Sequence, residues 1–107
     1  MLTFADFSEI NVRRCTEAFG SAMDEWSETD WATAVAGEVG EACNLIKKRR
    51  RGQEVEISEV GKELADAVTY IDLLATRLGL DLGTIVAEKF NEVSDRVGSR
   101  LKIKICT

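Results

Sequence analysis

The chain of 107 residues contains no proline, so no position forces a break inside a long helix. Glycines stand at positions 20, 52, 79 and 98, between segments whose apolar residues recur every three or four positions. The spacing therefore predicts an all-α fold, and the four expected helices cover residues 4–19, 31–51, 56 or 58 to 78, and 82–97.

Residues that commonly cap helices stand at three of the predicted starts. Thr3 or Asp6 begins the first helix, Asp30 the second and Asp81 the fourth, and residues 21–29 form a linker. The tail at 101–105 alternates apolar residues with lysine, which predicts a short strand or an extended arm. The sequence thus predicts one domain over residues 1–107, a small four-helix bundle with antiparallel neighbours and an extended C-terminal tail.

The composition excludes several classes of protein. The absence of histidine excludes Ser-His-Asp and Cys-His nucleophiles, His-ligated zinc and ferritin-like di-iron sites. A net charge of −5 argues against nucleic-acid binding. Cys15, Cys43 and Cys106 lack metal-type spacing, so we expect reduced cysteines that mostly pack in the core. No segment has the length and apolarity of a membrane span or a targeting signal, so a cytoplasmic location is expected.

The most informative feature is a carboxylate within the apolar stripe of the second helix. On a helical wheel at about 100° per residue, Glu38 falls in the middle of that stripe and Glu41 at its edge. The apolar members of the stripe are Trp31, Ala34, Val35, Ala42 and Leu45. A buried, unpaired carboxylate costs several kcal/mol, so a positive group is expected beside Glu38.

The third helix carries a second acidic pair, Glu63 and Asp66, with the same spacing of three. Glu63 borders the main apolar stripe, whereas Asp66 lies on a second apolar face beside Tyr70 and Leu73. A helix that is apolar on two sides is usually buried on two sides, here by its own bundle and by a second subunit. The pattern therefore predicts an oligomer.

Two antiparallel helices that each contribute two carboxylates would form an all-oxygen metal site. Such a site favours Mg²⁺, with Mn²⁺ as a substitute, and suits phosphoryl chemistry. The alternative is a set of surface salt bridges to Lys47, Lys48 or Lys62. The shared stripe of the second helix favours the metal site for Glu38 and Glu41, while the wheel does not decide for Asp66.

The motif Gly37-Glu38-Val39-Gly40-Glu41-Ala42, followed by Glu63-Leu64-Ala65-Asp66-Ala67, resembles the signature of the MazG-like all-α nucleoside triphosphate pyrophosphohydrolases. The segment 88–98 also resembles the segment that follows in many members. Gly37 stands where the full motif often has its first glutamate, a variant that is similar to the dCTP pyrophosphatases. The resemblance covers most of residues 30–98.

The resemblance implies hydrolysis of a (deoxy)nucleoside triphosphate to the monophosphate and pyrophosphate, as in clearance of unwanted nucleotides. It implies Mg²⁺ held by Glu38, Glu41, Glu63 and Asp66, in a homodimer or homotetramer with the site near a subunit boundary. Glu41, or else Glu38, is the expected acceptor of the water proton. Base and sugar preference and the number of ions stay open. The alternatives are a phosphoribosyl-ATP pyrophosphohydrolase and a non-catalytic helical interaction module.

Cations on the fourth helix are candidates for phosphate binding. Lys89 and Arg96 lie on the same edge of its apolar stripe, where they could contact phosphate oxygens or balance Glu92 or Asp95. The resemblance favours phosphate. Asn91 lies on the opposite face, so it serves the site through a neighbouring subunit or is simply exposed.

Two tryptophans are candidates for stacking on a base. Trp31 shares the stripe with Glu38, which favours a place in the core, and Trp26 in the polar linker is the better candidate for a base lid. The basic run 47–51 at a helix C-terminus is explained by the helix dipole and solvation, or it attracts a triphosphate to the site.

Overall fold

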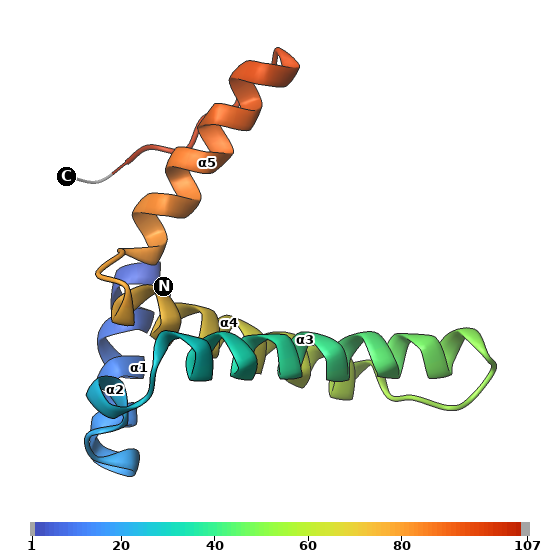
Figure 1. Ribbon diagram of the computed structural model, residues 1–107. Coiled ribbons are helices and arrows are strands. Elements are labelled where there is room, and N and C mark those ends of the chain that lie inside the picture. The colour runs from blue at the N-terminus through green and yellow to red at the C-terminus, as the bar shows by residue number, and fades with distance from the viewer. Residues whose placement is uncertain (1, 106–107) are drawn as a thin grey trace.

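The computed structural model describes residues 2–105 and contains five helices. They are α1 (Phe4–Phe19), α2 (Ala22–Glu25), α3 (Glu28–Arg50), α4 (Ile57–Arg77) and α5 (Leu82–Val97). Figure 1 shows their arrangement. No strand occurs within residues 2–105, so the predicted all-α class is confirmed. None of the helices described is long and apolar enough to cross a membrane.

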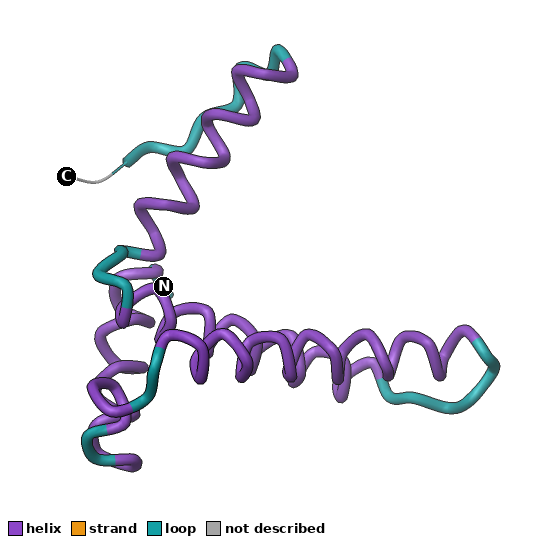
Figure 2. The backbone as a smooth tube through the Cα atoms, viewed as in Figure 1, coloured by secondary structure: helices purple, strands orange, loops and turns teal. Residues whose placement is uncertain are grey.

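The helices α3 and α4 form a long antiparallel hairpin, with α1 and α2 gathered at one of its ends (Figures 1 and 2). From that same end, α5 leads away from the hairpin. The expectation that α4 and α5 are antiparallel neighbours is therefore wrong. Leu82 at the start of α5 is buried, but Val86 and Phe90 farther along are exposed, so the apolar stripe of α5 is not held against α4 within residues 2–105.

The helix α1 begins at Phe4 as predicted, whereas α3 begins at Glu28, earlier than predicted. Thr3, not Asp6, caps α1, because its Oγ1 accepts the Asp6 backbone N–H at 3.0 Å. Ser27 caps α3, so the predicted cap at Asp30 is wrong. Ser27 Oγ accepts the Asp30 N–H at 3.1 Å, and the Asp30 carboxylate accepts the Ser27 N–H at 2.9 Å, which is a capping box. The expected linker at 21–29 is also shorter than predicted, because it holds α2.

The later helices match the sequence more closely. Asp81 caps α5 as predicted, and its carboxylate accepts both the Thr84 hydroxyl at 2.7 Å and the Thr84 backbone N–H at 3.0 Å. These two hydrogen bonds to the ionised form lower the pKa of Asp81. Gly98 ends α5 in the left-handed conformation with φ 75°.

The core lies where α1, α3 and α4 meet. Cys15, Trp31 and Leu73 are its buried centre, and the partly buried residues packed against them are Val12, Ala22, Met23, Tyr70 and Leu74. The prediction of a packing role is confirmed for Cys15 but wrong for Cys43, which is exposed on α3. Cys106 lies outside the described residues.

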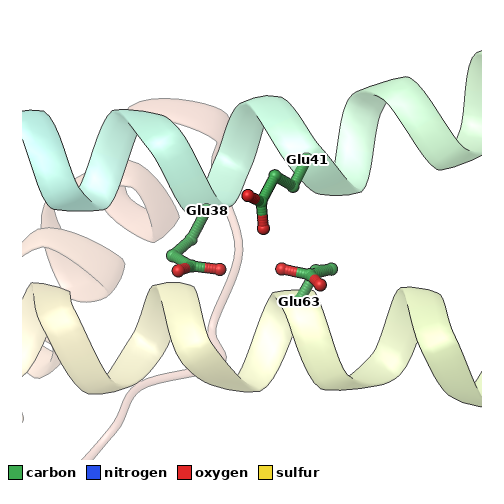
Figure 3. Close-up of side chains that lie close together, drawn as sticks. All are labelled: Glu38, Glu41 and Glu63. Carbon is green, nitrogen blue, oxygen red and sulfur yellow. The ribbon is translucent and has the colours of Figure 1, made fainter.

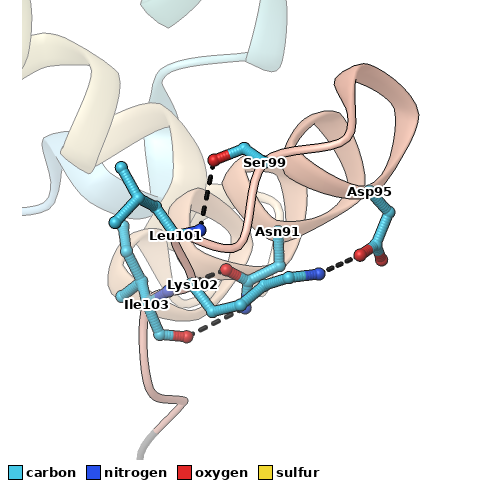
Figure 4. Close-up of polar contacts among 6 residues, drawn as sticks. All are labelled: Asn91, Asp95, Ser99, Leu101, Lys102 and Ile103. Carbon is cyan, nitrogen blue, oxygen red and sulfur yellow. Dashed lines mark hydrogen bonds and ion pairs between the residues drawn. The ribbon is translucent and has the colours of Figure 1, made fainter.

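The extended arm after α5 returns along that helix (Figure 4). The Asn91 side chain binds both backbone groups of Ile103: its Oδ1 accepts the Ile103 N–H at 2.7 Å, and its Nδ2 donates to the Ile103 carbonyl at 2.8 Å. Lys102 pairs with Asp95 beside this clamp. Of the two predicted forms of the tail, the structure has the extended arm.

The described chain is open rather than compact. Its radius of gyration is 16.3 Å, against about 13 Å for a compact domain of this length. Its accessible surface is 7906 Å², against about 5,900 Å² for a compact monomer of this mass. Because α5 does not contact α3, the described part of one chain does not close a four-helix bundle.

Candidate metal centre and adjoining cavities

Three glutamates meet between the helices of the hairpin. Glu38 and Glu41 project from α3 and Glu63 projects from α4 into the space between the two helices (Figure 3). One carboxylate oxygen of each residue lies within 4.8 Å of the corresponding oxygens of the other two. The spacing of three residues puts Glu38 and Glu41 on one side of α3, and the antiparallel packing of α4 places Glu63 opposite them.

Two of these carboxylates hold an enclosed oxygen that lacks a partner. Glu38 Oε2 and Glu63 Oε2 are shielded from solvent, and neither accepts a hydrogen bond from residues 2–105. A buried carboxylate oxygen without a donor is costly, so these oxygens favour a bound cation. Glu41 is the exposed member of the group.

No basic side chain of the described chain neutralises the three glutamates. The salt bridges found between residues 2 and 105 join Lys89 to Glu92 and Lys102 to Asp95, far along α5 and its arm. The alternative in which Lys47, Lys48 or Lys62 pairs with the acidic residues is therefore not what the structure contains.

The proximity of the glutamates changes their protonation. The Glu63 carboxyl raises the pKa of Glu41, first as a hydrogen-bonding neighbour and second as a like charge, and Asp66 adds to the rise. At Glu63, the adjacent Glu41 carboxyl acts to lower the pKa. The Glu38 carboxyl, partial desolvation and the charge of Asp66 outweigh that effect, so the pKa of Glu63 is raised as well. The group thus resists full ionisation unless a cation joins it.

Asp66, the fourth predicted ligand, is not part of this three-residue group. It lies with Glu38 in the wall of an adjoining cavity of about 250 Å³. The other walls of this cavity, which we call the polar cavity, are Asn11, Arg14, Cys15, Ala18, Phe19, Thr69, Tyr70 and Leu73. The structure therefore brings three of the four predicted ligands together and places the fourth one helical turn away, on the α1 side.

A second cavity of about 340 Å³, here called the aromatic cavity, contains both tryptophans. It shares Cys15, Phe19, Tyr70 and Leu73 with the polar cavity, and its further walls are Ala22, Glu25, Trp26 and Trp31. The Trp26 and Trp31 ring centroids are 4.5 Å apart. Trp31 is buried, as expected for a core residue, and its Nε1–H finds no acceptor within the described chain. Trp26 is 40% exposed at the rim.

The predicted phosphate-binding residues lie elsewhere in the chain. Lys89, Asn91 and Arg96 are on α5, which does not contact α3, so one chain does not bring them to the three glutamates. Lys89 binds Glu92 at 3.1 Å, and the amide of Asn91 is occupied by the arm.

Sequence reasoning missed Asn11, which lines the polar cavity, and Asp72, its hydrogen-bond partner. Both are buried, and they hydrogen-bond to each other across α1 and α4 at 2.9 Å. A signal for Asn11 was present, because it stands four residues after Phe7 and four before Cys15, within the apolar stripe of α1.

Comparison with known proteins gives no match: no family model, no curated protein and no solved structure resembles this chain closely enough to be identified with it.

Proposed function

We propose that this chain is a Mg²⁺-dependent hydrolase that cleaves nucleoside triphosphates to the monophosphate and pyrophosphate, in the manner of the MazG-like all-α enzymes. The observation that carries the proposal is the group of three glutamates, whose oxygens lie within 4.8 Å of one another without a basic partner in the described chain. The sequence motif around these residues supplies the substrate class.

The donor set suits a hard divalent cation. Glu38, Glu41 and Glu63 would hold Mg²⁺ or Mn²⁺, and the enclosed Oε2 atoms of Glu38 and Glu63 would gain the partner that they lack. When bound, the cation would supply charge neutralisation for the phosphate oxygens. Asp66 stands close enough to raise the pKa of Glu41 and Glu63, and it is a further ligand in the proposal.

Glu41 is the proposed proton acceptor. It is the exposed member of the group, so a water molecule can reach it, and its raised pKa makes it a stronger base than an ordinary glutamate. Glu38 and Glu63 are more enclosed, and their role is to hold the cation. The aromatic cavity beyond Tyr70 is a place for the base, with Trp26 at its rim.

The proposal includes assembly into a homodimer or homotetramer. The chain exposes about 2,000 Å² more than a compact monomer of its mass, which is the scale of an obligate interface. Leu64 and Val68 on α4 and Phe90 on α5 are among the large apolar residues left exposed. A second copy that covers them would complete the four-helix bundle and would bring its own Lys89 and Arg96 toward the site.

The test is a panel of ribo- and deoxynucleoside triphosphates, together with phosphoribosyl-ATP, incubated with Mg²⁺ and scored separately for pyrophosphate and orthophosphate. We expect pyrophosphate release that EDTA abolishes. Glu38→Gln and Glu63→Gln should abolish it, whereas Glu59→Gln, an exposed glutamate one turn before Glu63, should not. Absence of pyrophosphate from every substrate would refute the proposal and favour the non-catalytic interaction module.

A further inference from the structure

Asn11 is held in one orientation by two acceptors. The residue is 4% exposed, and its Nδ2 donates to Asp72 Oδ2 at 2.9 Å and to the Thr69 backbone carbonyl at 3.0 Å. An amide nitrogen carries two hydrogens, so both are used. Turning the amide over would place its oxygen against a carboxylate and a carbonyl and would lose both hydrogen bonds. Asp72, which is 1% exposed, therefore fixes which atom of Asn11 faces outward.

The atom left over is Asn11 Oδ1, a hydrogen-bond acceptor. It accepts no hydrogen bond from residues 2–105. Asp72 Oδ1 is also without a partner in that range, but it is sealed from solvent, whereas Asn11 Oδ1 is not. The free acceptor of Asn11 is thus the one that an incoming molecule can reach.

Asn11 belongs to the wall of the polar cavity, which also contains Glu38 and Asp66. The aromatic cavity adjoins it, because Tyr70 and Leu73 line both cavities. A molecule with a phosphate at Glu38 and a ring beside Tyr70 would occupy the polar cavity and would lie against Asn11.

We propose that Asn11 is a specificity-determining contact whose Oδ1 accepts a hydrogen bond from an O–H or N–H of the nucleoside, and that Asp72 is the positioning residue that keeps Asn11 an acceptor. This inference rests on the proposed function. A bound substrate that lacks this O–H or N–H would displace water from Asn11 Oδ1 without replacing the hydrogen bond. One neutral hydrogen bond of this kind corresponds to about two- to tenfold in kcat/KM, and more where the site is closed to water.

The donor is either a sugar hydroxyl or a base N–H, and three matched pairs of triphosphates separate these sources. A ribonucleotide and its 2′-deoxy form test the 2′-hydroxyl. A 2′-deoxy and a 2′,3′-dideoxy nucleotide test the 3′-hydroxyl. The pair dCTP and dUTP tests the base, because dCTP offers an amino group at C4 and dUTP offers an N–H at N3. The measurement is the ratio of kcat/KM within each pair.

We expect the wild-type protein to discriminate within one pair by about tenfold, in favour of the hydroxyl-bearing member if that pair differs in the sugar. Asn11→Ala should bring that ratio close to one. Asp72→Asn should lower it as well, because its amide can donate to Asn11 Oδ1 and so lets the Asn11 amide turn over. Asn44→Ala, which changes an exposed asparagine on the outer face of α3, should leave the ratio unchanged.

A purely structural role of Asn11 and Asp72 would lower kcat/KM for both members of a pair equally. The inference is overturned if the wild-type protein shows no preference in any pair, or if its preference survives in both Asn11→Ala and Asp72→Asn. Where Asn11→Ala fails to fold, the near-isosteric Asp72→Asn decides. If the wild-type protein hydrolyses none of the triphosphates, the proposed function is refuted, and this inference is refuted together with it.

Discussion

The buried pair of Asn11 and Asp72 should couple strongly in a double-mutant cycle of folding stability. Asp72→Ala removes the acceptor at 2.9 Å and leaves one buried N–H of Asn11 unsatisfied, while the bond to the Thr69 carbonyl at 3.0 Å survives. An unsatisfied buried group of this kind costs about 1–3 kcal/mol. Asn11→Ala is the more costly single change, because it leaves both oxygens of the buried Asp72 without a donor.

The double variant Asn11→Ala/Asp72→Ala removes both unsatisfied groups together, so it should lose less stability than the sum of the single changes. We expect a coupling of about 1.5–3 kcal/mol, as for a hydrogen bond to a charged group. The assay is urea unfolding followed by circular dichroism at one fixed protein concentration, because assembly would otherwise shift the midpoint.

An exposed pair serves as the control for this cycle. Lys89 and Glu92 are 3.1 Å apart with side chains 63% and 64% exposed, so their cycle should give only about 0.3–0.5 kcal/mol. A coupling between Asn11 and Asp72 that is no larger than this would refute the reasoning that Asp72 holds the Asn11 amide in place.

Three further predictions concern other parts of the chain. The pKa values of Glu41 and Glu63 are raised in the folded protein above the ordinary value of 4.5, so folding favours their protonated forms. The metal-free protein should therefore lose stability as the pH rises from about 4.5 through the raised values. Glu63→Gln should flatten that slope in urea titrations with EDTA; an unchanged slope would contradict the shift. Asn91→Ala should release the arm from α5. Hydrogen exchange at the Ile103 amide should then become about tenfold faster, while exchange in α3 stays unchanged. Unaltered protection of the Ile103 amide would contradict the role of Asn91 in holding the arm. Leu64→Glu on the exposed face of α4 should shift the protein toward monomer in size-exclusion chromatography, and an unchanged elution volume would place the interface elsewhere.

Helix positions were largely predictable because each helix carries local signals. Asp81 caps the start of α5, and Gly98 ends the helix in the left-handed conformation. Both features depend only on neighbouring residues. The predicted start of α3 is wrong because Asp30 also has the side chain of a cap. Asp30 is instead the third residue of the helix and forms a capping box with Ser27. The single turn α2 is too short to show a helical period.

The packing of α5 could not be predicted from its own residues. A short connection usually places two helices side by side, but the apolar stripe containing Phe90 is left exposed and does not hold α5 against α4. The orientation of such a helix depends on which surface covers its apolar stripe, and the sequence of α5 does not specify that surface.

The candidate site was partly predictable for a similar reason. Glu38 and Glu41 stood out because they interrupt an apolar stripe on their own helix, and the antiparallel hairpin then fixed Glu63 opposite them. Asn11 and Asp72 are 61 residues apart, and each looks like a tolerated polar residue on its own helix. The hydrogen bond between them forms only when α1 packs against α4, so neither helix alone indicates it.

Binding of a divalent cation by the three glutamates is the central claim, and a titration with Mn²⁺ followed by electron paramagnetic resonance tests it directly. We expect the wild-type protein to remove free Mn²⁺ from solution, and Mg²⁺ to compete for the same site. Glu38→Gln and Glu63→Gln should lose this binding, and Glu59→Gln should retain it. Equal Mn²⁺ binding by all four proteins, or by none, would contradict the assignment of these carboxylates as a metal centre.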